Sequence, residues 1–308
     1  MDITATLKTF SKYTILHSQY QYAIDTVLAS IETTEECEDP SCPIMMGESG
    51  TGKSSICKRL EQLMGRPASL LEADGLLIQS LPCLYLELPA RPTIKSVAGA
   101  ILEKLKISTV NKGTSAERQI LTALKRRKTR LVILDEFQNF ANKGAAITKK
   151  ETCGWIKYML NESGITFLLS GEPFDAGIID PQKQVSQRYP YRIELSNLIY
   201  GADPQSEFRT ILGLFAAEIE KLGQLHSDLF LGDLHMSAAL YMGSGGNMRG
   251  IRRLLHAAFK RALIRGDGRL TIEDFAEGIK RLHLPDRIKK EQNPFLINTQ
   301  QIMKALGQ

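Results

Sequence analysis

Residues 47 to 54 carry glycine, lysine and serine at the spacing G-x-x-x-x-G-K-S, a pattern that binds the phosphates of a nucleotide. Its glycines let successive backbone N–H groups turn towards phosphate oxygens, and the dipole of a following helix favours the same anion. Lys53 would reach the β- and γ-phosphates, and the hydroxyl of Ser54 would ligate Mg²⁺. The pattern therefore predicts binding of ATP with Mg²⁺.

The flanks of this stretch support the prediction. The apolar run of residues 43–46 is typical of a strand, and apolar residues recur at helical spacing after Ser54. A glycine-rich turn before an ordinary helix is the alternative. The residues expected to bind the nucleotide are Gly47, Glu48, Ser49, Gly50, Thr51, Gly52, Lys53, Ser54 and Ser55.

Two carboxylates follow a second apolar run, residues 131–134, which suits a strand covered on both faces. Ligands of open α/β sheets bind at the carboxyl ends of the strands, where these two side chains would lie. Asp135 is expected to hold Mg²⁺ through water, and Glu136 to orient or deprotonate the attacking water. Asp-Glu pairs after apolar runs are common, but one downstream of a phosphate loop indicates ATP hydrolysis.

Two further polar residues end or precede expected strands. Ser170 would lie one strand away from Asp135 and could contact the γ-phosphate or the water, although a simple strand-to-loop serine is equally compatible. Arg188 precedes a short strand ending at residue 195, at the edge of the domain. From there an arginine can reach the γ-phosphate held by a neighbouring subunit, whereas a surface salt bridge is the simpler alternative.

The elements that position these residues alternate between apolar runs and helical patterns, which predicts an α/β fold with a five-stranded parallel sheet between helices. From residue 203 onward the pattern is helical only and predicts a small helical lid. The expected regions are a helical amino-terminal extension and linker, a nucleotide-binding domain, the lid and a loosely held tail, at residues 1–40, 41–200, 201–285 and 286–308.

Composition adds limits to this interpretation. The chain of 308 residues is 43% hydrophobic and 24% charged, an ordinary globular balance, and its net charge of +5 permits contact with nucleic acid. Its five cysteines form no C-x-x-C pair, which disfavours a zinc site or a disulfide framework. No apolar run is long enough for a membrane span or a signal core, so we expect a cytoplasmic protein without a membrane partner.

The order of phosphate loop, Asp-Glu strand, polar strand end, edge arginine and helical lid resembles an AAA+ ATPase over residues 43–282. This resemblance implies that Arg188 acts as an arginine finger. It also implies that Arg249, in the sequence Gly-Asn-Met-Arg at a helix start, acts as the sensor-2 residue. Short members of the group described next often have glycine near the position of Arg249.

Within AAA+ proteins, the segments 167–173, 184–189 and 245–255 look like the TniB/TnsC group of transposition regulators. The resemblance implies an ATPase that forms a ring or helical filament on double-stranded DNA and connects a target-selection protein, TniQ-like or similar, to a transposase. It also implies that the helix after the second strand and the loop behind it grip DNA, here through Lys95, Lys112 and Thr114.

Two other functions remain compatible with the sequence. An AAA+ helicase or clamp loader would share every ATPase residue and differ in its partners. A nucleotide-gated scaffold would need no DNA at all.

Overall fold

The computed structural model describes residues 2–71, 77–107, 114–140, 149–173, 178–226 and 229–307. The chain forms two compact units. One is an α/β unit of residues 19–195, and the other is a helical unit made from residues 1–18 and 196–308. The two termini of the chain therefore belong to the same unit.

The α/β unit is built on a five-stranded sheet in the order β4-β5-β6-β1-β7, in which every pair of neighbours is parallel. This sheet confirms the predicted fold class. The strands are β1 (Pro43–Gly47), β4 (Cys83–Glu87), β5 (Leu131–Asp135), β6 (Thr166–Gly171) and β7 (Tyr191–Leu195). A separate antiparallel hairpin, β2 (Ser69–Leu71) with β3 (Leu77–Gln79), precedes β4.

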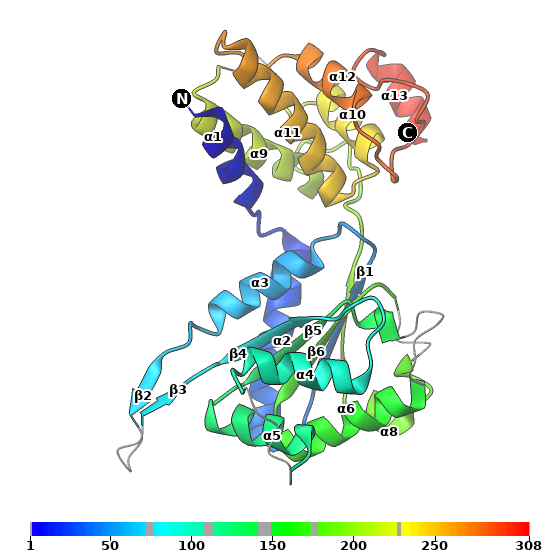
Figure 1. Ribbon diagram of the computed structural model, residues 1–308. Helices are drawn as coiled ribbons and strands as arrows, with labels where there is room; N and C mark the ends of the chain where they lie inside the picture. Colours follow the sequence, from blue (N-terminus) through cyan, green and yellow to red (C-terminus); the bar gives the residue numbers. More distant parts are fainter. Residues whose placement is uncertain are drawn as a thin grey trace. The chain divides into compact units, whose positions relative to one another are not determined.

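Helices cover both faces of this sheet, which explains why its strands are continuously apolar. Within β1, Ile44 and Met46 join one core cluster, whereas Met45 joins another. The cluster containing Met45 is closed by α2 (Ser18–Cys37) and α3 (Lys53–Leu63), and the other by α4 (Ile94–Lys104), α5 (Ala116–Arg126) and α6 (Lys149–Ser163). Figure 1 shows α4 and α2 on opposite sides of the strands.

Two short elements complete the α/β unit near its strand ends. The 3₁₀ helix η1 (Phe137–Phe140) follows β5 directly, and its two phenylalanines are buried with ring centroids 5.3 Å apart. The short helix α8 (Lys183–Ser186) precedes β7. Because η1 is anchored by both aromatic rings, the residues just after Asp135 are held against the core.

The helical unit packs around aromatic side chains. It contains α1 (Ile3–Lys12), α9 (Glu207–Gly223), α10 (Leu234–Ser244), α11 (Met248–Arg265), α12 (Ile272–Lys280) and α13 (Thr299–Leu306). Phe10 of α1 lies edge-on against Phe215 and Phe259, with centroid separations of 6.1 and 5.5 Å. Figure 1 shows α1 beside α9 and α11. The structure thus places residues 2–18 in the unit of the carboxyl-terminal helices, whereas residues 19–40 belong to the α/β unit.

The carboxyl-terminal segment is part of this core. Phe295 and Ile302 are 3% and 0% exposed, and α13 packs against α10. Our description of residues 286–308 as a loosely held tail is therefore wrong. Two apolar side chains, Phe295 and Ile302, anchor the segment because each is almost completely buried.

Candidate nucleotide site

The predicted phosphate loop connects β1 to the first turn of α3. Gly50 and Gly52 have φ angles of +90° and +110°, a region that L side chains rarely adopt. At Gly47 the constraint is space, because an added Cβ would lie 2.6 Å from the carbonyl oxygen of Leu195 on β7. Each of the three glycines is thus required by the local geometry of the loop.

Side chains of the loop fold over its own backbone. Lys53 is buried, and its Nζ donates to the carbonyl oxygens of Gly47 at 2.6 Å and Glu48 at 2.9 Å. Thr51 Oγ1 also donates to Glu48 O, at 2.9 Å. Ser54 is exposed in the first turn of α3. The lysine ammonium therefore lies against the loop whose amides would receive phosphate.

Asp135, at the carboxyl end of β5, is only 1% exposed. Its Oδ1 accepts from Ser170 Oγ at 2.8 Å and from the backbone N–H of Glu136 at 3.0 Å, and its Oδ2 accepts from Tyr85 Oη at 3.0 Å. All of these donors are neutral, and within the described ranges no lysine or arginine pairs with Asp135. The carboxylate is therefore buried without a compensating cation among the described side chains.

Two neighbours of Asp135, the side chains of Tyr85 and Cys57, are kept protonated by burial and by the Asp135 carboxylate. Burial, and then the nearby Asp135 carboxylate, raise the pKa of the Tyr85 hydroxyl well above its ordinary range. The same two causes raise the pKa of the Cys57 thiol in α3. Neither group can ionise near neutral pH, so Tyr85 acts as a permanent hydrogen-bond donor to Asp135.

Glu136 is positioned by an unusual backbone conformation. Its φ angle is +60°, which is uncommon for a residue with a side chain and turns the chain directly after β5. Its Oε2 accepts from Gln138 Nε2 at 2.6 Å, and Gln138 Oε1 accepts from the backbone N–H of Glu172 at 3.0 Å. Gln138 thus connects the carboxylate to the chain just after β6. Sequence reasoning missed this residue, because no motif marks it.

The sheet brings the phosphate loop, Ser170 and Asp135 to the carboxyl ends of its central strands. β6 lies between β5 and β1, and Met45 of β1 is in register with Ser170 of β6. All three strands are parallel, so their carboxyl ends lie side by side. Asp135 and Ser170 are at the ends of β5 and β6, and the phosphate loop follows β1. The adjacency of Ser170 and Asp135 agrees with the expectation from sequence, and their side chains are directly hydrogen-bonded.

Arg188, expected to act on a neighbouring subunit, forms an ion pair with Asp39 of its own chain. Its carbonyl oxygen also accepts from the N–H of Cys42 at 2.8 Å. Both partners lie in the connection between α2 and β1. Within one subunit, Arg188 therefore makes the salt bridge that was the simpler alternative, and Asp39 is a contact that the sequence did not indicate.

The remaining predicted residues that the structure describes lie on helices or just before them. Lys95 is exposed in the first turn of α4, and Thr114 is exposed before α5. Lys112 lies outside the described residues. Arg249 is exposed in the first turn of α11, in the helical unit.

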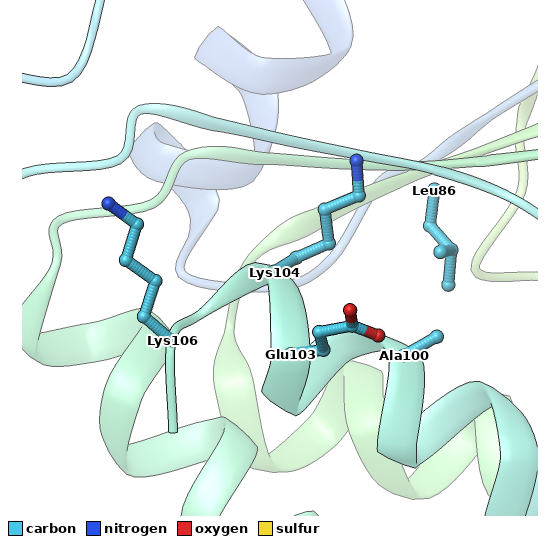
Figure 2. Close-up of a pocket in the computed structure, with 5 residues that line it drawn as sticks. All are labelled: Leu86, Ala100, Glu103, Lys104 and Lys106. Atoms are coloured by element: carbon cyan, nitrogen blue, oxygen red, sulfur yellow. The ribbon is translucent and has the colours of Figure 1, made fainter. Parts of the chain in front are cut away.

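The end of α4 borders a surface pocket of about 430 Å³. Figure 2 shows the ammonium groups of Lys104 and Lys106 on the same side of the helix end, with the Glu103 carboxylate between Lys104 and Ala100; Leu86 completes the lining. Lys104 and Lys106 are exposed and were not predicted as contact residues. Lys104 and Lys106 lie at the opposite end of α4 from Lys95.

The described ranges lack two features, a cluster of metal ligands and a membrane-spanning helix. No cluster of three or more histidine, cysteine, aspartate or glutamate residues with metal-binding geometry was found there. Among the same residues, no helix combines the length and apolar character needed to cross a membrane. The lack of a metal-ligand cluster among these residues does not conflict with Mg²⁺ at Asp135. Sites that bind Mg²⁺ with nucleotides use one or two carboxylates, a hydroxyl and the phosphates themselves.

Solved structures with the same fold include two ORC proteins and a CDC6 protein. The ORC2 protein of Aeropyrum pernix, solved with ADPNP and ADP, matches with a TM-score of 0.60 and 17% identity, covering 85% of this chain and 67% of that one. The ORC1 protein of the same organism, in complex with DNA, matches with a TM-score of 0.56 and 20% identity over 89% and 67% of the two chains. CDC6P from Pyrobaculum aerophilum matches with a TM-score of 0.55 and 15% identity, covering 84% of this chain and 65% of that one.

These similarities identify the fold as that of AAA+ ATPases, and the chain spans about two thirds of the length of these proteins. No curated protein matches the sequence. A family model described as the bacterial TniB protein matches residues 9–196, which is more than half of the chain and includes the phosphate loop, Asp135, Glu136, Ser170 and Arg188. The chain therefore belongs to the TniB family of AAA+ ATPases.

Proposed function

We propose that this protein is an ATP-dependent, DNA-binding regulator of transposition, which assembles on duplex DNA and connects a target-selection protein to a transposase. The observation that carries the proposal is the TniB family match over a chain whose predicted phosphate loop is accompanied by a buried carboxylate with neutral hydrogen-bond donors. ATP binding would control assembly, and hydrolysis would release it.

The residues at the carboxyl ends of β1 and β5 fit binding of Mg²⁺ and ATP. A buried carboxylate surrounded only by neutral donors is costly unless a cation neutralises it, and Asp135 meets this description. Asp135 and the Ser54 hydroxyl would hold Mg²⁺, while the loop amides and Lys53 would hold the phosphates. The metal would supply charge neutralisation on the β- and γ-phosphate oxygens.

The water-activating role falls to Glu136. Its carboxylate is partly exposed, unlike that of Asp135, and is fixed by Gln138 at 2.6 Å, so it is available to accept a proton from water. Ser170 would keep Asp135 oriented through the 2.8 Å hydrogen bond. In the assembled state, Arg188 would exchange Asp39 for the γ-phosphate on the neighbouring subunit.

Contact with DNA would use the outer face of α4 and the loop after it, through Lys95, Lys112 and Thr114. Lys104 and Lys106, at the other end of α4, are further exposed lysines. Contacts of this kind neutralise phosphates without reading bases, so binding should be nearly independent of sequence and strongly weakened by salt. The A. pernix ORC1 protein, which has the same fold, was solved with DNA.

The test is electron microscopy of the protein with duplex DNA and a slowly hydrolysed ATP analogue. We expect rings or filaments on DNA that are absent without nucleotide. Lys53→Ala should abolish assembly by removing a phosphate contact, and Arg188→Ala should abolish it while leaving ATP bound. Particles that remain monomeric and free of DNA at every salt concentration would rule out the assembly. A transposase that is unaffected by the protein would rule out the role in transposition.

A further inference from the structure

The helix α11 is basic along its whole length and contains no carboxylate. Its charged side chains are Arg249, Arg252, Arg253, Lys260, Arg261 and Arg265. Sequence patterns cannot tell which of these stabilise the helical unit and which face outward. The structure separates them into two groups.

Arg252, Arg261 and Arg265 have structural contacts. The guanidinium of Arg252 donates to the carbonyl oxygens of Ser11 and Tyr13 and lies 5.5 Å from the ring centroid of Phe215. On another side of the helix, Arg265 Nη1 contacts the buried Asp274 at 2.5 Å, and Arg261 Nε lies 4.0 Å from the same carboxylate. These arginines join α11 to α1, α9 and α12.

Arg249, Arg253 and Lys260, here called the basic stripe, are exposed and occupy another face. Their spacing of four and seven residues returns each to nearly the same side of the helix, and they span about 16 Å along its axis at about 1.5 Å per residue. Within the part of the chain that the structure describes, Arg253 and Lys260 form no ion pair. Among the described residues, the charges of Arg253 and Lys260 therefore have no ion-pair partner.

The surroundings of the basic stripe do not reduce this charge. The acids that interact with α11, Glu273 and Glu277 as well as Asp267 and Asp274, do so through Arg265 and Arg261. The adjacent α1 adds the exposed Lys8 and Lys12, and its acid, Asp2, caps its own helix at Ala5 N.

His256 lies within the basic stripe, between Arg253 and Lys260. Burial, and then Lys260, lower the pKa of His256, so this imidazole is neutral at neutral pH. The cations of the stripe are therefore its arginines and its lysine.

We propose that the basic stripe is a second contact for the phosphate backbone of duplex DNA, located on the helical unit. This inference rests on the proposed function, because it assigns a further surface to the same partner. A rigid row of cations over about 16 Å matches a strand that carries a phosphate every ~3.4 Å along the duplex axis. Between Arg249 and Lys260 the stripe presents no exposed aromatic or large apolar side chain, the kind of anchor that protein interfaces use.

The experiment removes two charges of the basic stripe outside the predicted nucleotide site. Full-length Arg253→Gln with Lys260→Gln is compared with the control Lys221→Gln and Lys304→Gln, which removes equal charge from exposed positions on α9 and α13. Fluorescence anisotropy with a labelled duplex is measured over a range of salt concentrations. We expect the slope of log affinity against log salt to become shallower by about 2 in the stripe variant, since each lost phosphate contact removes about 0.9.

The affinity of the stripe variant at low salt should fall by about tenfold or more, and the control should bind like the wild type. ATP affinity and circular dichroism should be equal in all three proteins, which shows that the helical unit is intact. Equal affinities and slopes for the stripe variant and the control would overturn this inference while leaving the proposed function standing. A wild-type protein that fails to bind duplex at low salt would overturn both, and binding of polyglutamate in place of duplex would assign the stripe to an acidic protein.

Discussion

Two buried aspartates, one in each unit, have equal burial and different partners. Asp135 at the end of β5 and Asp274 in the first turn of α12 are each 1% exposed. Asp135 is surrounded by hydroxyl and amide donors, whereas Asp274 is contacted by Arg265 and Arg261. Asp274 also accepts from the N–H of Thr271 at 3.0 Å, as a helix cap.

The difference shows that burial alone does not identify a functional carboxylate. Asp274 has its counterions within its own unit, so its charge contributes to folding. Asp135 lacks them among the described residues, which leaves room for a metal ion and the lysine-held phosphates. The charge of a buried residue's partners is thus more informative than its exposed fraction. The following predictions test this distinction.

The largest effect is expected at Glu136, which stands next to Asp135 but is partly exposed. Glu136→Gln should reduce ATP turnover by about 10²- to 10⁴-fold, because a general base is lost, while ATP affinity is retained. Steady-state hydrolysis and equilibrium nucleotide binding measure the two quantities. Glu87→Gln is a matched control, since this exposed carboxylate ends the neighbouring strand β4. If both variants hydrolyse ATP at similar rates, Glu136 is not the base.

Asp135→Asn should separate function from stability. Loss of the carboxylate should lower Mg²⁺-dependent turnover by about 10²-fold, on the scale of losing one preorganised charge interaction. Without Mg²⁺ and nucleotide, however, the variant should be as stable as the wild type or more stable, because a buried charge without a cation is removed. Thermal unfolding in the presence of a chelator measures this. A strongly lowered midpoint would mean that Asp135 is a structural residue like Asp274.

Much of the candidate nucleotide site follows from local sequence. The predicted phosphate loop has glycines whose spacing sets the backbone, and Asp135 and Ser170 lie at the ends of apolar runs that are typical of buried parallel strands and are adjacent in the sheet. These features depend on residues close in sequence or on a sheet pattern that is simple to recognise. The fold class could be predicted for the same reason.

Contacts that depend on how loops and helices pack could not be predicted. Gln138 reaches Glu136 only because a left-handed residue and a 3₁₀ turn follow β5. Asp39 meets Arg188 only because the connection before β1 runs beside the residues before β7. The sequence predicted a helical amino-terminal extension over residues 1–40, but it did not indicate that α1 packs in the helical unit through Phe10.

The smallest effect on chemistry and the clearest effect on folding are expected at Asp274. Asp274→Asn keeps the shape of the side chain but removes the charge that binds Arg265 and Arg261, and it should lower the free energy of unfolding of the helical unit by about 2 kcal/mol. This value is below that for breaking a fully buried pair because Arg265 is 35% exposed and is resolvated by water. Urea titration followed by circular dichroism measures the change.

Glu277→Gln is the control on the same helix, since its contact with Lys280 at 2.5 Å is exposed and should contribute much less. ATP binding should be unchanged in both variants, because Asp274 finds all its counterions inside the helical unit. A loss of nucleotide affinity in Asp274→Asn without a loss of stability would reverse the roles that the partners of the two aspartates indicate.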